Sequence, residues 1–150
     1  MRVVIQRVSE ASVRIDEREH ARIGTGMLVL LGIEAGDTEA DLEWLCGKIA
    51  RLRIFPDAEG VMNEDIMQAH GELLLVSQFT LHASTAKGNR PSYIRAARPE
   101  EAVPLYLRMK QRLTESIGRP VRTGEFGAMM QVQLVNEGPV TIIIDSRSKE

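Results

Sequence analysis

Short apolar runs open the chain, and they predict strands before any helix. Residues 2–8 (RVVIQRV) and 11–16 (ASVRID) are short and rich in β-branched side chains, and residues 27–33 (MLVLLGI) are apolar throughout. A continuous apolar run of this length is typical of a strand buried on both faces. The first quarter of the chain is therefore predicted to be a β meander.

The apolar period then changes from that of a strand to that of a helix. Apolar side chains recur at helical spacing at Leu42, Leu45, Cys46, Ile49 and Leu52. Thr38, with Asp41 three residues later, resembles a capping box. These features predict an amphipathic helix from about Thr38 to Arg53.

A second helix is predicted from about Pro99 to Ile117. Proline suits a first helical turn, and Gly118 suits a C-terminal cap. Pro104 lies inside this segment, where it would either move the start of the helix to about Val103 or kink its first turns.

Three further strands are predicted, at residues 72–79, 130–135 and 140–145, the last two joined by the sequence NEGP. Strands come first, two helix–strand steps follow, and a strand pair closes the chain. This order predicts a single α+β domain over residues 1–150, with two sheet layers and helices packed on one side. Residues 146–150 are predicted to form a loose tail.

The composition is that of an ordinary globular protein, with 43% hydrophobic and 27% charged residues. One cysteine, Cys46, excludes an internal disulfide and fits a reducing compartment. No apolar run approaches the roughly 18–20 residues that span a bilayer, and the N-terminus lacks the pattern of a signal peptide. We expect a cytoplasmic protein with no membrane segment.

The charge is balanced overall but locally biased. A net charge of −2 argues against a broad nucleic-acid groove. The interval between Glu72 and Glu100 nevertheless has no acidic residue, and its basic residues are Lys87, Arg90, Arg95 and Arg98. This segment is either a solvated basic loop or a rim that contacts anions.

Most motifs of enzyme chemistry are absent from the sequence. The histidines are far apart, with no cysteine or carboxylate at metal-ligand spacing, and GTGMLV (24–29) leads into a strand rather than the helix of a dinucleotide fingerprint. Ser77 and Thr80 are hydroxyls close to His82, but VSQFT does not match a nucleophile elbow. Thr80 and His82 would share one strand face, which allows at most a dyad with no acid to orient it.

Two features remain. The first is the polar end of the apolar strand, at Ser77, Gln78 and Thr80, because a strand that stops pairing leaves backbone N–H groups free to bind an oxyanion. The second is NEGPVT (136–141), where Gly138-Pro139 is predicted to form a turn. A trans bond is favoured there by frequency alone, since only about 5–6% of X–Pro bonds are cis in folded proteins.

Together, SQFTL (77–81) and NEGPVT (136–141) resemble the D-aminoacyl-tRNA deacylases. The flanking blocks resemble the same family in the same order: IQRVSEASV, GMLVLLGIEAGDTE, RIFPDAEGVMN, GNRPSY and MQVQLVNEGPVT. Tyr93 stands where that family is expected to have phenylalanine. The resemblance covers nearly the full chain.

The resemblance implies a homodimer with its active site at the subunit interface and with no metal or organic cofactor. Such enzymes hydrolyse the ester between a D-amino acid, or glycine, and the terminal ribose of tRNA, and they spare L-aminoacyl-tRNA. The segment Ser77, Gln78, Phe79 and Thr80 is expected to line the site. The Gly138-Pro139 peptide is expected to be cis and to enter the partner's pocket.

Three hypotheses follow from this resemblance. A rigid Gly138-Pro139 peptide would reject L-substrates by steric clash. Backbone N–H groups near Phe79 and Thr80 would hold the oxyanion, so that Thr80 need not be a nucleophile. The four basic residues from Lys87 to Arg98 would hold the tRNA acceptor end, although Arg90 would equally suit a structural role in its loop.

Two alternative functions stay open at this point. One is a non-catalytic protein that binds an RNA end or a nucleotide, in which Ser77 and Thr80 only satisfy local hydrogen bonds. The other is a serine-type esterase of small substrates that uses Ser77 or Thr80 as nucleophile.

Overall fold

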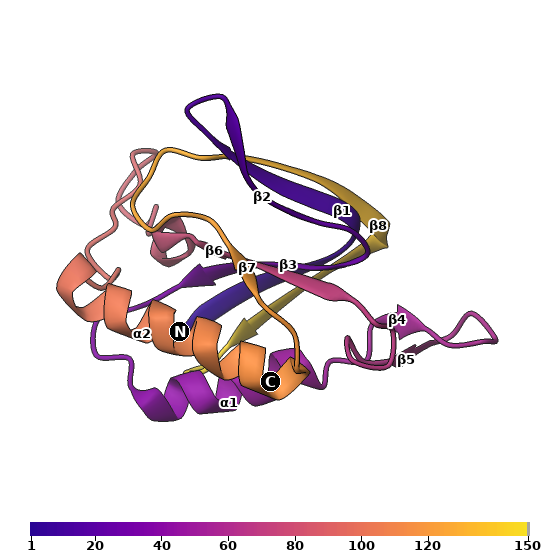
Figure 1. The fold of residues 1–150 in the computed structure, drawn as a ribbon. Coiled ribbons are helices and arrows are strands. Elements are labelled where there is room, and N and C mark those ends of the chain that lie inside the picture. Colours follow the sequence, from indigo (N-terminus) through magenta and orange to yellow (C-terminus); the bar gives the residue numbers. More distant parts are fainter. Residues whose placement is uncertain (150) are drawn as a thin grey trace.

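The computed structural model, which describes residues 1–149, contains one six-stranded mixed sheet, a two-stranded ribbon and two long helices (Figure 1). The strands are β1 (Arg2–Ile15), β2 (Arg18–Ile23), β3 (Gly26–Gly32), β4 (Phe55–Pro56), β5 (Met62–Glu64), β6 (Glu72–Ser77), β7 (Arg122–Thr123) and β8 (Gln131–Asp145). The helices are α1 (Glu39–Ala50), α2 (Pro99–Ile117) and the short 3₁₀ helix η1 (Phe79–His82).

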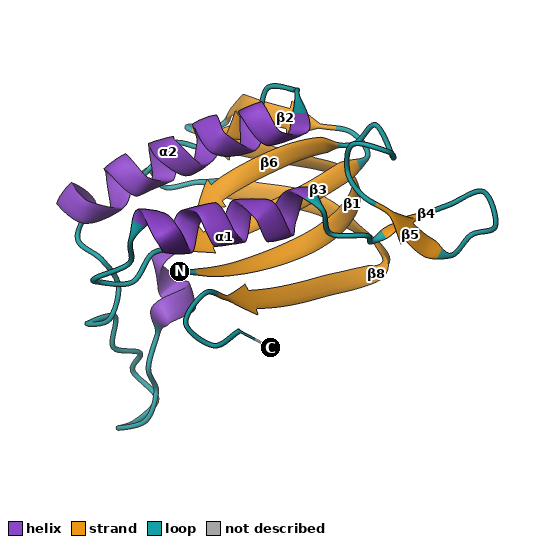
Figure 2. Cartoon of the chain, turned by 90° about the horizontal axis from the view of Figure 1, so that it is seen from below, coloured by secondary structure: helices purple, strands orange, loops and turns teal. Residues whose placement is uncertain are grey.

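The strand order in the large sheet is β2-β1-β3-β6-β7, and β8 pairs with the other edge of β1. β1 is antiparallel to β2, β3 and β8, whereas β6 runs parallel to both β3 and β7. The sheet curls until β2 lies against β6 and β7. Both long helices cover the same side (Figure 2), as predicted, but the two predicted layers are parts of one curled sheet.

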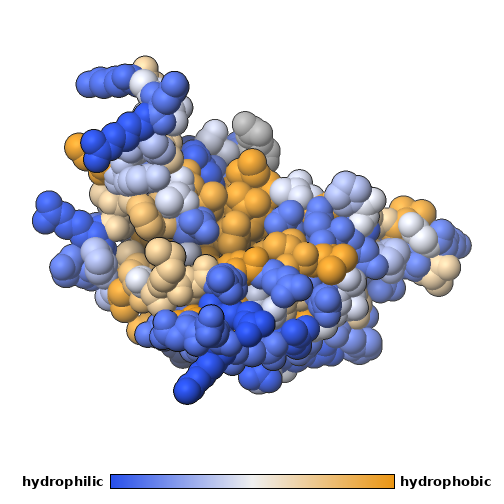
Figure 3. All heavy atoms as spheres, turned by 90° about the horizontal axis from the view of Figure 1, so that it is seen from above, coloured by the Kyte–Doolittle hydropathy of each residue, from blue (hydrophilic) through white to orange (hydrophobic). Residues whose placement is uncertain are grey.

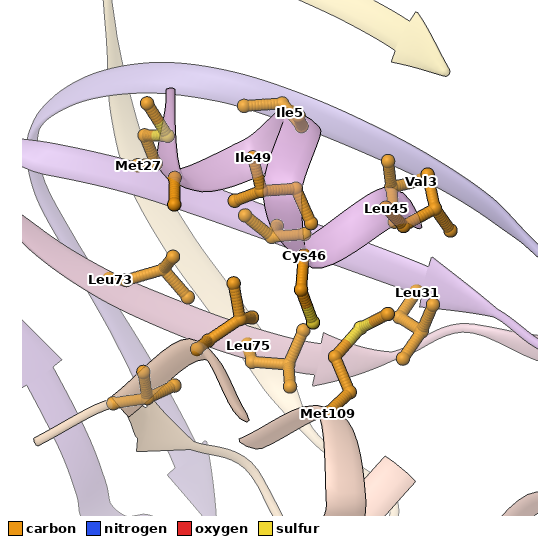
Figure 4. Packing of buried hydrophobic residues seen from close by; sticks show 14 of the residues in the cluster. Val3, Ile5, Met27, Leu31, Leu45, Cys46, Ile49, Leu73, Leu75 and Met109 are labelled. Carbon is orange, nitrogen blue, oxygen red and sulfur yellow. The ribbon is translucent and has the colours of Figure 1, made fainter. Parts of the chain in front are cut away.

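The apolar strands β3 and β6 are buried on both faces. Since side chains alternate along a strand, their residues enter two different hydrophobic clusters. On one face, Leu31 and Leu75 pack with Ile49 of α1 and Met109 of α2 (Figure 4). The opposite face points into the curl, where Leu28, Leu74 and Val76 meet Val8 and Val13 from β1. A strand covered twice needs no polar positions, which explains the continuous apolar runs.

Both helices are found where they were predicted, except that α1 ends at Ala50 instead of Arg53. In α1, the Asp41 carboxylate accepts a hydrogen bond from the Thr38 amide at 2.9 Å, as the capping box requires. α2 begins at Pro99 and is followed by Gly118 in the left-handed conformation, with φ 67°. Pro104 lies inside α2 and does not move its start. None of the helices in residues 1–149 has the length and apolar character needed to cross a bilayer.

Two strand predictions are wrong in the same way. The segments 2–8 and 11–16 form one continuous strand, β1, because β2 takes over from β3 as its partner at the point where the sequence turns polar. The segments 130–135 and 140–145 likewise form one strand, β8. Both remain continuous because β1 and β8 pair along almost their whole length.

The predicted loose tail is fixed in place at its start. Ser146 is buried, and its amide donates a hydrogen bond to the Met1 carbonyl at 2.9 Å. The Arg147 guanidinium donates to the Ala35 carbonyl at 2.8 Å and lies 3.0 Å from an Asp37 carboxylate oxygen. These contacts hold the tail through Arg147, and Glu150 falls outside the described residues.

Candidate active site

β6 ends at the polar residue Ser77, and the chain passes from the end of this strand into η1. The last sheet-like bond is donated by the Gln78 amide to the Leu31 carbonyl of β3, at 2.7 Å. The next two amides, of Phe79 and Thr80, donate no hydrogen bond to any residue from 1 to 149. Sequence reasoning extended the strand to Phe79; it ends at Ser77, and the chain then enters a helical turn. Two adjacent unpaired N–H groups therefore stand at the start of η1.

A pocket of about 280 Å³ adjoins this turn. Its wall includes Ser77, Gln78 and Phe79, together with Phe126 and Met129 from the segment between β7 and β8. The small residues Ala97, Ala102, Gly127 and Ala128 also line it. A mostly apolar hollow with a few polar groups at one side is the usual form of a small-molecule site.

The rim of this pocket carries aromatic and apolar side chains that are open to solvent. Phe79 is 55% exposed, and its ring meets that of Tyr93 edge to face, with centroids 5.0 Å apart. Met129 is 93% exposed. Aromatic faces of this kind can stack with nucleobases.

The hydroxyls at the site lack a catalytic partner. Thr80 Oγ1 accepts a hydrogen bond from the Gln78 side-chain amide. The His82 ring, at the other end of η1, is fully buried, and neither ring nitrogen has a hydrogen-bond partner in residues 1–149. Burial lowers the pKa of His82, although Glu34, with one carboxylate oxygen 3.8 Å from Nδ1, acts against this shift. The structure contains no nucleophile–base pair here.

The four predicted basic residues lie in or next to the loop between η1 and α2, but they differ in their contacts. Lys87 and Arg90 are exposed, and Arg98 is the exposed N-cap residue of α2. Arg95 donates from Nε to Glu34 Oε1 at 2.7 Å. This hydrogen bond is the main reason that the pKa of Glu34 lies below its usual value.

The Gly138-Pro139 peptide is cis, the state implied by the resemblance and not the one favoured by frequency. It is not the predicted turn, because it lies within β8 as an outward bulge. Gln6 pairs with Thr141 and Val8 with Asn136, so that residues 137–140 stand opposite one residue of β1. A bulge is where a strand accommodates proline. The Asn136 side-chain amide fixes the base of the bulge by donating to the carbonyls of Arg7 and Val140.

The bulge and the pocket are separate in one chain. Glu137, Gly138 and Pro139 are exposed, and none of them lines the pocket beside η1. Sequence reasoning also did not identify the pocket residues Ala102, Phe126 and Met129. Phe126 and Met129 belong to a glycine-containing segment, GEFGAMM (124–130), and Ala102 belongs to the predicted second helix, and neither segment carries recognisable chemistry.

Other chemistry has little support in the described residues. No group of three or more His, Cys, Asp or Glu side chains among them is placed to hold a metal ion. Cys46 is buried in the core, and burial raises the pKa of its thiol to about 12. Such a thiol is suited to packing rather than to nucleophilic attack.

A curled mixed sheet with two helices thus carries two unpaired backbone amides beside a mostly apolar pocket. The model of the D-Tyr-tRNA(Tyr) deacylase family matches residues 4–145. The chain belongs to this family. The family predicted from the two motifs is thus confirmed, and with it the class of enzyme, a hydrolase of ester bonds.

Relatives in bacteria match the chain from end to end. It is 57% identical to the D-aminoacyl-tRNA deacylase of Bacteroides thetaiotaomicron and 60% identical to that of Porphyromonas gingivalis, in each case over 150 residues and 100% of both chains. The solved structure of a c-Myc DNA Unwinding Element Binding Protein is 39% identical, with a TM-score of 0.91 over 97% of this chain and 98% of that one. A probable eukaryotic D-amino acid tRNA deacylase shares the fold at 18% identity, with a TM-score of 0.82 and coverage of 95% and 97%.

Proposed function

We propose that this protein hydrolyses the ester bond of D-aminoacyl-tRNA and glycyl-tRNA, releasing the amino acid and free tRNA, while it spares L-aminoacyl-tRNA. The observation that carries this proposal is the pair of unpaired amides at Phe79 and Thr80, beside a pocket with an aromatic rim. The family and its full-length relatives supply the substrate class. The protein would act in the cytoplasm, where aminoacyl-tRNA is made and used.

The chemistry needs little from the protein because an aminoacyl ester is already activated. Water adds to the ester carbonyl, and the carbonyl oxygen becomes an oxyanion that accepts hydrogen bonds from the N–H groups of Phe79 and Thr80. The ribose oxygen then leaves with a proton, and its neighbouring 2′-hydroxyl can assist the attack. A fixed position for the ester against these amides supplies the rate enhancement.

The acceptor end of the tRNA would be held in two ways. The terminal base would enter the pocket or stack on its rim at Phe79, whose edge-on contact with Tyr93 steadies the ring. Lys87, Arg90 and Arg98 would contact backbone phosphates from the adjoining loop. No metal or organic cofactor takes part in this scheme.

The working form would be a homodimer. In residues 1–149, β8 pairs with β1 alone, so its outer edge is unpaired. Apolar side chains on β8 are open to solvent, among them Val135 and Ile143. A strip of apolar atoms crosses this side of the molecule (Figure 3). Unpaired edges and apolar patches are features that a partner subunit covers.

A dimer would also bring the Gly138-Pro139 bulge to a pocket. The bulge is exposed in its own chain and lines no pocket there, which fits insertion into the site of the partner subunit. Its backbone would then stand against the substrate α-carbon and clash with an L side chain. A D side chain or the hydrogen of glycine would point away.

Gly138→Ala tests this selection. A Cβ at Gly138 would lie 2.7 Å from Arg7 Nη2 and 3.0 Å from Val140 Cγ2, on a backbone with φ 122° that side chains rarely adopt. We expect the bulge to deform and the ratio of L- to D-ester hydrolysis to rise. Loss of both activities in the same proportion would argue against selection by the bulge.

The deciding experiment compares the hydrolysis of one tRNA charged with a D- or an L-amino acid. Rapid release of the D-amino acid alone supports the proposal, and equal rates would refute chiral selection. Binding without turnover would favour the non-catalytic RNA-end binder. Hydrolysis of simple esters, blocked by hydroxyl-directed covalent inhibitors, would favour a serine-type esterase.

A further inference from the structure

Three residues lie side by side across the sheet next to the candidate site. Arg2 of β1 pairs in register with Gly32 of β3 on one side and with Asp145 of β8 on the other. This row lies at the ends of the three strands, where η1 packs against β3 and β1. Figure 2 shows η1 close to the start of β1.

The Arg2 guanidinium joins the end of β8 to η1. Its Nη1 donates to the Leu81 carbonyl at 2.8 Å, while Nε donates to Asp145 Oδ2 at 2.9 Å and Nη2 lies 2.8 Å from the same oxygen. Leu81 directly follows Thr80 in the turn. One planar cation thus ties the backbone of the turn to a fixed point in the sheet.

The ion pair that orients this guanidinium is partly shielded from solvent. The side chains of Arg2 and Asp145 are 31% and 13% exposed. Burial alone would raise the pKa of Asp145, but hydrogen bonds from the Arg147 amide and from Arg2 outweigh it and lower the pKa. Asp145 therefore stays ionised, and Arg2 is held in a geometry that lysine could not reproduce, since the donors of lysine all lie on one nitrogen and lack the planar fork of a guanidinium.

Gly32 lets the turn come close enough for this contact. A Cβ at Gly32 would lie 2.9 Å from Leu81 Cβ, 3.0 Å from His82 Cδ2 and 3.1 Å from the Gln78 carbonyl oxygen. The turn therefore packs directly against the backbone of Gly32, which pairs with Arg2 in the sheet. The Leu81 carbonyl of the turn accepts a hydrogen bond from Arg2 itself.

We propose that Arg2 is a positioning residue for ester hydrolysis: its bond to the Leu81 carbonyl, fixed by Asp145, orients the turn that presents the Phe79 and Thr80 amides to the oxyanion. This inference rests on the proposed function, because Arg2 acts through those amides. Arg2 does not line the pocket beside η1. It should therefore affect the chemical step and leave affinity for the acceptor end nearly unchanged.

The test uses Arg2→Ala, Arg2→Lys and Asp145→Asn in the full-length protein, with Arg22→Ala as control. Arg22 makes ion pairs with Glu10 and Glu19 at a solvent-exposed site on β2, so it matches the charge and the chemistry lost. The measurements are kcat and KM on D-aminoacyl-tRNA and the NMR shifts of the Phe79, Thr80 and Leu81 amides. Sedimentation velocity checks that each variant keeps the wild-type assembly state.

We expect Arg2→Ala to lower kcat about 10-fold with little change in KM, because a misplacement of about 1 Å can cost about 10²-fold and a smaller displacement costs less. Arg2→Lys and Asp145→Asn should lower kcat by less, and both should move the three amide signals. Arg22→Ala should change neither kcat nor these amide signals. If Arg2→Ala does not fold, the two milder variants carry the test.

The possible failures are distinguishable. A wild-type protein that does not hydrolyse D-aminoacyl-tRNA would overturn the proposed function itself. Unmoved amide signals and unchanged kcat in an active protein would overturn only the role of Arg2. Moved signals with wild-type kcat would show that the turn does not hold the oxyanion, and would overturn the role of Arg2 in the reaction. A rise in KM with constant kcat would make Arg2 a binding residue and overturn the proposal.

Discussion

The side-chain amide of Gln78 donates a hydrogen bond to the hydroxyl oxygen of Thr80. An amide cannot remove a proton from that hydroxyl, and the buried ring of His82 leaves Thr80 without a general base. We therefore predict that Thr80→Val, which keeps the side-chain shape, loses less than about 10-fold in single-turnover hydrolysis of D-aminoacyl-tRNA. Participation in proton transfer would cost roughly 10²–10⁴-fold.

Two results would contradict this view. In the wild-type protein, an acyl group trapped on Thr80 and detected by mass spectrometry would make the hydroxyl a nucleophile. So would a large loss of rate in a Thr80→Val protein whose thermal unfolding matches wild type.

Gly32→Ala is predicted to displace the turn that carries the Phe79 and Thr80 amides. The new Cβ would be too close to Leu81 Cβ and to the Gln78 carbonyl, at 2.9 and 3.1 Å, so the turn must move away from β3. We expect a loss of about 1–3 kcal/mol in the free energy of unfolding, as for other overpacked sites, and a lower kcat. Chemical denaturation and steady-state kinetics measure the two effects.

Gly24→Ala is the matched control for this change. Its Cβ would meet only Glu72 Oε2, at an ordinary 3.5 Å. The Gly32 explanation would be wrong if both variants behaved alike, or if Gly32→Ala unfolded more easily but kept full kcat in its folded fraction.

His82 is predicted to make the fold sensitive to mild acid. Burial lowers its pKa below the ordinary value of 6.5, with Arg2 and the N-terminal amine acting in the same direction and Glu34 against them. The unfolded chain then binds a proton more readily than the folded one, so stability decreases as the pH falls below about 6.5 and is restored above it. The free energy of unfolding, measured by denaturant titration from pH 7.5 to pH 5, should show this slope.

His82→Leu should flatten that slope, because leucine fills the buried site without titrating. His20→Leu provides the control, since His20 is an exposed histidine on β2. An unchanged slope in His82→Leu would assign the acid sensitivity to other groups.

Local patterns were sufficient to predict the helices and the buried strands. The capping residues Thr38 and Asp41 and the terminal pair Pro99 and Gly118 act within a few positions of the chain, so the sequence carries their effect directly. The apolar run of β3 likewise reports burial on both faces. The α+β class and the side covered by the helices followed from these elements.

The pairing of distant strands could not be predicted in the same way. Polar Ser9 and Glu10 separate the two strands predicted at residues 2–8 and 11–16, but β1 continues through them because β8 is paired alongside. Gly138 and Pro139 have the composition of a turn, and only the register with β1 shows that they form a bulge. The pocket has the same origin, since Phe126 and Ala102 meet Phe79 through the fold and not through spacing.

The last prediction separates the basic residues of the loop between η1 and α2. Lys87 and Arg90 are exposed, whereas Arg95 is bound to the mostly buried Glu34. We predict that Lys87→Glu and Arg90→Glu weaken tRNA binding, and that each lowers the slope of log affinity against log salt by about 0.7–0.9, the value for one phosphate contact. Arg95→Glu should instead lower the melting temperature, because it places a second carboxylate beside Glu34.

Lys110→Glu, on α2, is the charge-matched control, since Lys110 lies outside the basic loop and does not line the pocket. Filter binding of deacylated tRNA over a range of salt concentrations gives the slopes, and thermal melts give the stabilities. Arg90→Glu separates the two roles open to Arg90. A lower salt slope with a wild-type melt makes it an RNA contact, and a lower melting temperature with an unchanged slope makes it a structural residue of the loop. If Lys87→Glu and Arg90→Glu bind tRNA as tightly as Lys110→Glu does, the acceptor end is not held by this loop.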